Sequence, residues 1–458
     1  MRNIKISKFT LSPSTVIRSD PCYTINIIAF NTKTQKRTEL NKTGYIVLKI
    51  LENNSLTVKD LTYLLFKEIT PPYLLAITDF ITNMLDEGFV IISDKVARDV
   101  PDYQPKKFRD ISIPITSTPY EVEMHLTSAC NLKCVHCAYN SGEPLPDELK
   151  LENWRKVIDE LEKLRVLKLI ISGGEPFLFR HIRELLAYIV NRRMHIDILT
   201  NGSLIDADIA RRLNSPNLAV TVSLDGASKE THDSFRGARC FNKVINGIQM
   251  LAMNGVTFHL STVVHKKNIE EIEAMVKLAL HYEAHSISFV LIDPIGRGKG
   301  AHGYLLSHEE RNFIISKVKK ISDRYKKEIP IGYLDPSIPS YSDLYMSELE
   351  DKIYCTAGTT RIAIRSDGCV FPCVYAFGND DFCGGNINNE NIEDIWFKNT
   401  WETFRGAISL YDLPHCRSCE YNKVCTLKLC RLRAYAISGD LYGVPPNCYR
   451  YLYIRDEP

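Results

Sequence analysis

The sequence predicts an α/β protein: a partial (β/α)6 barrel with an N-terminal winged-helix domain and a cysteine-rich C-terminal domain. Six apolar, strand-like stretches alternate with amphipathic helical stretches from residue 120 to about residue 300, and this alternation is typical of parallel sheets with right-handed crossovers. Six units are too few to close an eight-stranded barrel. Nine of the 14 cysteines lie at or after Cys355, where periodic hydrophobicity is weak, so we expect a fold stapled by metal there.

The N-terminal domain, residues 1–95, is predicted from one extended stretch, three helices and a closing strand. A linker is expected over 96–118, which contains several prolines among mixed charges. The elements are expected at 23–30 (extended), after the N-cap Asn41 (first helix), at 57–68 (second helix), from Pro72 to the C-cap Gly88 (third helix) and at 89–92 (strand).

The barrel domain is expected over 119–300, with chemistry at the carboxyl ends of its strands. A helical bridge over 301–350 and the cysteine-rich domain over 351–458 follow it. The six barrel strands are predicted at 121–126, 166–172, 195–200, 219–224, 257–264 and 286–291.

The charge balance and the apolar segments of the sequence indicate where the protein is expected and which partners they do not favour. Lys and Arg number 57 against 55 Asp and Glu, a net charge of +2, so no bulk field favours nucleic acid or an anionic membrane. No apolar segment follows the basic start, and no stretch approaches the roughly 18 apolar residues of a membrane span. We therefore expect a cytoplasmic protein whose clustered cysteines are metal ligands or redox centres rather than disulfides.

A cysteine triplet follows the first barrel strand. Cys130, Cys134 and Cys137 form a C-x3-C-x2-C pattern, and three thiolates can hold three irons of a [4Fe–4S] cubane while the fourth iron stays open. Zinc prefers four ligands, so this spacing fits it poorly. The triplet resembles that of radical S-adenosylmethionine (SAM) enzymes. The resemblance implies that the open iron binds SAM and that reductive cleavage yields the 5′-deoxyadenosyl radical.

Further segments resemble the SAM-binding parts of that family. The second strand ends in a Gly-Gly-Glu-Pro motif, whose glycines permit close backbone approach. The resemblance implies that this motif addresses the SAM amino group, that Ser223 and Asp225 meet the ribose, and that Arg236 approaches the carboxylate. The implied SAM-binding residues are Gly173, Gly174, Glu175, Pro176, Ser223, Asp225 and Arg236. The run from Gly296 to Gly300 lacks the pattern of a phosphate-binding loop, and we expect a flexible or SAM-proximal loop there.

The C-terminal cysteines resemble the SPASM domain, an extension of radical SAM enzymes that binds auxiliary iron–sulfur clusters. The resemblance implies two sets of ligands: Cys355, Cys373 and Cys430 for auxiliary cluster I, and Cys416, Cys419, Cys425 and Cys448 for auxiliary cluster II. Cluster I lacks an obvious fourth ligand, for which Cys369 and Cys383 are candidates. Read alone, Cys416, Cys419, Cys425 and Cys430 fit one tetrahedral zinc equally well. Cys22 and Cys240 have no evident partner.

The N-terminal domain resembles the PqqD-like element that binds the leader of a ribosomally made precursor peptide. The resemblance lies in 40–45 and 57–61, and the third helix lacks Lys and Arg, so it is poorly suited to DNA. Such elements hold the leader as an added strand. The implied partners are a precursor peptide and a reducing electron donor such as flavodoxin or ferredoxin.

We expect a radical SAM peptide maturase that forms a cross-link, a thioether in the leading hypothesis. A SPASM enzyme that tailors a small molecule is the alternative, because 430–436 is similar to enzymes of haem-type and mycofactocin pathways. A zinc-stapled binding protein is the non-enzymatic alternative. Related sulfatase-maturing enzymes place an aspartate after the second SPASM cysteine, whereas Val374 follows Cys373 here, which disfavours formylglycine formation. No catalytic base stands out.

Overall fold

The computed structural model describes residues 7–19, 27–93, 95, 116–237, 239–333, 352–419, 430–445 and 448. Most of the expected linker, at 96–115, and the end of the expected bridge, at 334–350, lie outside these residues. So do Cys22 and Cys425. Within the described part, no helix is long and apolar enough to cross a bilayer.

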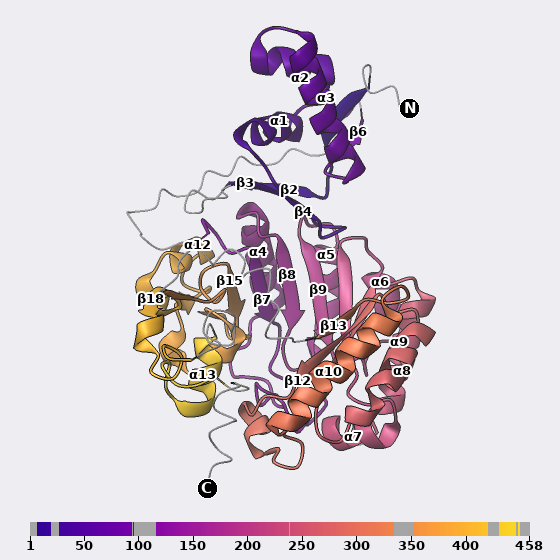
Figure 1. Cartoon of the computed structure of the whole chain (residues 1–458), viewed down its shortest axis with the longest axis vertical. Coiled ribbons are helices and arrows are strands. Elements are labelled where there is room, and N and C mark those ends of the chain that lie inside the picture. The colour runs from indigo at the N-terminus through magenta and orange to yellow at the C-terminus, as the bar shows by residue number, and fades with distance from the viewer. Residues whose placement is uncertain are drawn as a thin grey trace.

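The N-terminal unit contains two small sheets and three helices (Figure 1). Asn41 caps the first helix by accepting a hydrogen bond from the Gly44 amide, and Thr57 caps the second in a reciprocal pair with Asp60. Gly88 follows the third helix and has φ +80°, the left-handed conformation with which many helices end. Its elements are β1 (Lys8–Leu11), β2 (Thr15–Ser19), β3 (Ile27–Asn31), β4 (Arg37–Glu39), α1 (Lys42–Glu52), β5 (Leu56–Thr57), α2 (Val58–Phe66), α3 (Pro71–Asp86) and β6 (Val90–Ile92).

The central domain is the predicted partial barrel. Its six expected strands are all present, pair in parallel in sequence order, and are joined by one further parallel strand, β13. The elements are β7 (Glu121–His125), α4 (Leu151–Lys163), β8 (Lys168–Ser172), α5 (Ile182–Ile189), β9 (His195–Thr200), α6 (Ala207–Leu213), β10 (Leu218–Ser223), α7 (Lys229–Arg236), α8 (Phe241–Met253), β11 (Phe258–Val264), α9 (Ile272–His281), β12 (Ser286–Leu291), α10 (His308–Tyr325) and β13 (Ile331–Tyr333).

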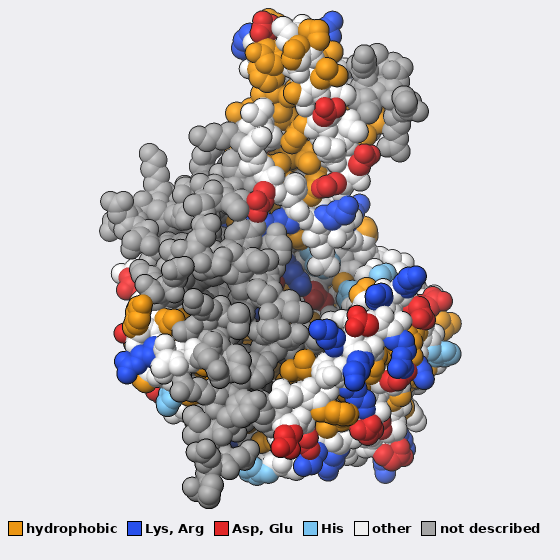
Figure 2. Space-filling view, viewed as in Figure 1, with side chains coloured by type: hydrophobic (Ala, Val, Ile, Leu, Met, Phe, Trp, Pro, Cys, Tyr) orange, Lys and Arg blue, Asp and Glu red, His pale blue; other side chains and the backbone are white. Residues whose placement is uncertain are grey.

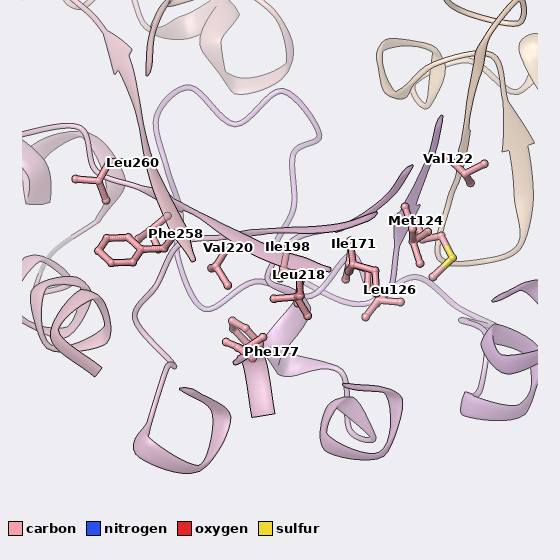
Figure 3. Close-up of a cluster of buried hydrophobic side chains, with 14 of the residues drawn as sticks. Val122, Met124, Leu126, Ile171, Phe177, Ile198, Leu218, Val220, Phe258 and Leu260 are labelled. Carbon is pink, nitrogen blue, oxygen red and sulfur yellow. The ribbon is translucent and has the colours of Figure 1, made fainter. Parts of the chain in front are cut away.

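Alternation along the strands decides which side chains face the helices. Met124, Ile171, Ile198 and Val220 come from four neighbouring strands and are fully buried in one core, on the side of the sheet that Figure 3 shows next to Phe177. The residues between them point to the opposite, barrel-facing side, because side chains alternate along a strand. That side is therefore where polar strand residues such as those of β7 collect.

The sheet continues into the C-terminal domain, which the sequence did not predict. β15 pairs in parallel with β7, and β16 and β17 extend the sheet further by antiparallel pairing. The domain also shares the apolar core of the barrel, since Trp396, Trp401 and Phe404 belong to the same buried cluster and are at most 1% exposed, so burial contributes where we expected metal to dominate. Its elements are β14 (Lys352–Tyr354), β15 (Arg361–Ile364), β16 (Cys369–Phe371), β17 (Gly385–Asn386), α12 (Ile392–Trp396), β18 (Arg405–Ser409) and α13 (Arg431–Ser438).

The N-terminal unit docks on the amino ends of the barrel strands (Figure 1). Arg165, just before β8, forms a buried ion pair with Glu52 of α1 at 3.0 Å. The Arg193 guanidinium donates to the Thr15 carbonyl, and Nδ1 of His195, the first residue of β9, lies 3.0 Å from the Thr32 carbonyl oxygen. The carboxyl ends of the same strands, where chemistry is expected, are thus at the opposite edge from this unit.

Candidate functional site

The cysteine triplet lies on the loop after β7, at the carboxyl edge of the sheet. Cys130, Cys134 and Cys137 pack together in one small apolar cluster with Leu132, and all three are free thiols. Burial, with smaller contributions from the charges of Cys134 and Cys137, raises the pKa of Cys130 to about 11. Three thiols gathered on one loop form a site suited to a cation.

The donor set fits a [4Fe–4S] cluster that keeps one iron free. Each thiolate of a cubane binds a different iron, so the sulfurs of the triplet need not converge on one point. Among the residues that the structure describes, no three His, Cys, Asp or Glu side chains converge closely enough to hold a single metal ion.

Arg297, which follows β12, is hydrogen-bonded to this loop. Its Nε donates to the Cys134 carbonyl at 2.9 Å, its Nη1 to the Ser141 carbonyl at 2.8 Å, and its amide to the Cys137 carbonyl at 3.0 Å. Gly296 has φ +57°, and a Cβ there would lie 2.4 Å from the Cys137 carbonyl oxygen. The segment expected as a flexible or SAM-proximal loop contains a short 3₁₀ helix, Gly296–Gly300, which is hydrogen-bonded to the cysteine loop.

The Gly-Gly-Glu-Pro segment lies against the same loop. A Cβ on Gly173 would lie 2.4 Å from the Thr127 carbonyl oxygen, and one on Gly174 would lie 2.2 Å from that of Ala129. The amides of Gly174 and Glu175 donate to those same two carbonyls. Two glycines are therefore needed for the end of β8 to reach the cysteine loop. Pro176 then begins a short 3₁₀ helix, of which Pro176 and Phe177 are buried.

Glu175 is fully buried, and its carboxylate is held by the end of β9. It accepts hydrogen bonds from the Thr200 hydroxyl and the Asn201 amide at 2.8 Å each, and from the Phe177 amide at 3.2 Å. Burial nevertheless raises the pKa of Glu175 to about 7. A buried carboxylate poised near neutrality beside the cysteine loop can receive a positively charged group.

Asp225 and Arg236 pair with each other. The Nε of Arg236 donates to Oδ2 of the buried Asp225 at 2.5 Å, and the Val263 amide donates to Oδ1 at 2.8 Å. His136, between the second and third cysteines of the triplet, lies 3.8 Å from Asp225. The structure thus brings two of the predicted SAM-contacting residues together. Burial raises the pKa of the Cys134 thiol, and the nearby charge of Arg236 opposes that rise. Ser223 is half-buried at the end of β10, opposite Ser261.

Cys240 lies beside the triplet, although the sequence showed no partner for it. It packs in the same apolar cluster, and its thiol hydrogen-bonds the Asp233 carboxylate at 3.3 Å and the Gly237 carbonyl at 2.9 Å. Burial and the Asp233 charge raise its pKa to about 12. A thiol held protonated in this way is a neighbour of the site rather than a fourth thiolate.

The C-terminal cysteines form separate groups. Cys355 and Cys430 share a hydrogen bond that lowers the pKa of Cys355, and the charge of Cys373 opposes this lowering. Burial raises the pKa of Cys373 to about 11, and the charge of Cys430 contributes to that rise. Cys369 and Cys383, the candidates for a fourth ligand, hydrogen-bond each other instead. The set expected for auxiliary cluster I is therefore brought together as a group of three.

The set expected for auxiliary cluster II is described in part. Cys416, Cys419 and Cys448 are all half-buried and form no disulfide. Cys416 packs beside Ile353, Ile408 and Leu413, and its carbonyl accepts a hydrogen bond from the Cys419 amide.

Two polar residues of the barrel wall were not predicted from the sequence as candidate functional residues. Glu123 and His125 lie on the barrel-facing side of β7, buried and 3.0 Å apart. The alternation Glu-Val-Glu-Met-His over 121–125 was the available signal, because it places acidic and imidazole groups on one side of a strand whose other side is apolar.

Comparison with known proteins shows which family models the chain matches and which proteins it resembles in sequence. Residues 124–279 match the model of the radical SAM superfamily, and residues 355–420 match that of an iron–sulfur cluster-binding domain, SPASM. The chain is 31% identical to an AdoMet-dependent heme synthase of Methanosarcina barkeri over 73% of this chain and 98% of that protein. It is 28% identical to the mycofactocin maturase MftC of Mycobacterium tuberculosis over 74% of this chain and 84% of that protein.

Solved structures resemble the whole chain. SuiB of Streptococcus suis bound to S-adenosylmethionine superimposes with a TM-score of 0.69 at 16% identity, covering 96% of this chain and 99% of SuiB. The same protein bound to its precursor peptide SuiA superimposes with a TM-score of 0.67 at 16% identity, with the same coverage. The structural match covers 96% of this chain, whereas the sequence match to the heme synthase covers 73% of it.

Proposed function

Because the chain belongs to the radical SAM superfamily and carries a SPASM domain, we propose that it is a maturase that binds a precursor peptide and cross-links it, with a thioether as the bond formed. Enzymes of this family use SAM and a [4Fe–4S] cluster, and SPASM domains hold auxiliary iron–sulfur clusters. The predicted domain limits, 1–95, 119–300 and 351–458, serve as working boundaries for the peptide-binding, barrel and cluster parts.

The residues proposed for each cofactor follow the groups described above. Cys130, Cys134 and Cys137 would hold the catalytic cluster, with Arg297 holding their loop. Glu175 would receive the SAM amino group, and Arg236 would face its carboxylate from a position fixed by Asp225. When bound, the cluster and SAM supply the 5′-deoxyadenosyl radical that removes a hydrogen atom from substrate.

Peptide binding by the N-terminal unit is supported by its surface. Large apolar side chains are exposed on this unit (Figure 2), among them Tyr63 at 54% and Leu75 at 62%. β4 and β6 are edge strands with one paired neighbour each, and an edge can accept an extended peptide as an added strand. Helix α3 contains no Lys or Arg, so it lacks the cations that would bind phosphate groups.

The test is to find a short cysteine-containing reading frame beside the gene, express its product with this chain, and weigh the peptide. We expect a loss of two hydrogens per cross-link, with 5′-deoxyadenosine formed from SAM under dithionite. Protein that contains zinc without iron and sulfide after anaerobic purification would contradict every radical mechanism.

A second candidate is the tailoring of a small molecule, favoured by the 31% identity to the heme synthase. Surface variants separate the two functions better than deletion of 1–95, since deletion would uncover the buried Arg165. Leu75→Asp should weaken peptide modification at least tenfold if the peptide binds on this unit, whereas conversion of a small molecule should be unaffected. Met253→Asp, at a residue 79% exposed on α8, is the matched control and should leave either reaction unchanged.

A further inference from the structure

A carboxylate and an imidazole form a buried pair on the barrel-facing side of β7. Oε1 of Glu123 and Nε2 of His125 lie 3.0 Å apart, and the residues are 5% and 4% exposed. Val122 and Met124 fill the apolar core on the other side of the strand. Polar groups cost free energy to bury, and the sheet does not need them for pairing, so a chemical use is the better explanation.

The imidazole lies where the two cysteine-bearing parts of the molecule meet. His125 pairs across the sheet with Ser172, which directly precedes Gly173. The His125 ring contacts Tyr139, two residues after Cys137, and Phe377, four residues after Cys373, with centroid distances of 4.8 Å each. A substrate between the catalytic and auxiliary cysteines would therefore lie next to His125.

The pair fixes which nitrogen can accept a proton. Burial alone would raise the pKa of Glu123, but the hydrogen bond with His125 and the charge of Arg361, 3.5 Å away, hold that pKa below its usual value. An ionised carboxylate can only accept, so Nε2 of His125 is the nitrogen that donates to Glu123, and Nδ1 is the nitrogen left to accept a proton. Within the part of the chain that the structure describes, no hydrogen-bond partner of Nδ1 is seen, and this atom is not fully enclosed by protein atoms.

We infer that His125 is the general base of the cross-linking reaction and that Glu123 positions it. The inference rests on the proposed function. In this step the S–H bond of a substrate cysteine breaks, the sulfur keeps the electron pair, and the proton forms an N–H bond at Nδ1 of His125. The resulting imidazolium is stabilised by the Glu123 carboxylate, as in other base–orienter pairs. Other titratable groups near this pair are Arg361, Lys168, Tyr139 and Cys373.

The experiment compares His125→Gln with the wild type in the reconstituted holoenzyme, using the cysteine-containing precursor peptide encoded beside the gene. Removal of the base should lower cross-link formation about 10²- to 10⁴-fold, while 5′-deoxyadenosine formation continues, because hydrogen-atom abstraction needs no base. The Kd for a fluorescent precursor peptide should stay at the wild-type value. Imidazole in the buffer should partly restore cross-linking to His125→Ala, and Glu123→Gln should lie between His125→Gln and the wild type.

His281→Gln is the matched control, since His281 is exposed at the end of α9, and it should cross-link like the wild type. The inference is overturned if His125→Gln cross-links at the wild-type ratio to 5′-deoxyadenosine, if both products fall together, or if imidazole restores nothing. Wild-type protein that makes 5′-deoxyadenosine but leaves the peptide unaltered would instead overturn the proposed function, and the inference with it.

Discussion

At the scale of single residues, Arg297 holds the loop proposed to carry the catalytic cluster without contributing a ligand. Its three hydrogen bonds end on carbonyls of the cysteine loop. Two of these bonds come from the charged guanidinium and are worth roughly 1.5–3 kcal/mol each. Arg297→Ala should therefore reduce the iron and sulfide bound after reconstitution and lower 5′-deoxyadenosine formation at least tenfold. Lys299→Ala, on the same segment but exposed, should load like the wild type. Equal loading of both variants would show that the loop does not depend on Arg297.

Glu175 should give the protein a measurable pH dependence. Burial raises its pKa from 4.5 to about 7, so the native state binds more protons than the unfolded state between these values, and stability falls as pH rises through this range. The fall amounts to about 3 kcal/mol at 1.36 kcal/mol per unit. The difference in free energy of unfolding between the wild type and Glu175→Gln should therefore be about 3 kcal/mol larger at pH 5 than at pH 8, as anaerobic denaturation without SAM at both pH values would measure. Burial lowers the pKa of His136, His195, His232 and His265, and these groups change stability with pH in the opposite direction equally in both proteins. Identical pH slopes would contradict the expectation.

At the scale of elements, the ion pair between Arg165 and Glu52 fixes helix α1 to the barrel. Both side chains are at most 9% exposed, and Arg165 also donates to the Ile17 carbonyl. Glu52→Ala leaves a buried guanidinium without its counter-ion, which should lower the free energy of unfolding by roughly 3–5 kcal/mol. Denaturant titration measures this loss. Glu68→Ala, at an exposed position of the same unit, should change stability little. Similar values for both variants would mean that the docking does not depend on this pair.

Elements whose signals are local could be predicted from the sequence. The cap at Asn41, the second helix near 57–68 and the six barrel strands depend on residues within a few positions, and the structure confirms them. The continuation of the sheet could not be predicted, because β15 pairs with β7 across some 240 residues and no local pattern specifies that register. The pairing of Asp225 with Arg236 was not predicted either, because the family resemblance implied a separate SAM contact for each residue. Only the fold shows that the two side chains bind each other.

At the scale of the whole molecule, the proposed peptide-binding unit and the cysteine loop lie at opposite edges of the sheet. Arg193 and His195 contact the N-terminal unit at the start of β9, whereas Asn201, just after β9, bonds to Asn131 of the cysteine loop. β9 has six residues, which span roughly 20 Å at about 3.3 Å per residue. A peptide held by the N-terminal unit must cover at least that distance to reach the cluster.

This distance predicts a minimum spacer in the precursor peptide. An extended chain covers about 3.3 Å per residue, so about six residues must separate the docked leader segment from the first modified residue. Shortening the spacer to three residues should abolish cross-linking while the peptide Kd stays constant, because the leader still docks. Lengthening it by six Gly and Ser residues should cost little, since closure entropy grows only slowly with length. Mass spectrometry of the co-expressed peptides measures both outcomes. Cross-linking that persists with a three-residue spacer would mean that the leader binds at the carboxyl edge of the barrel rather than on the N-terminal unit.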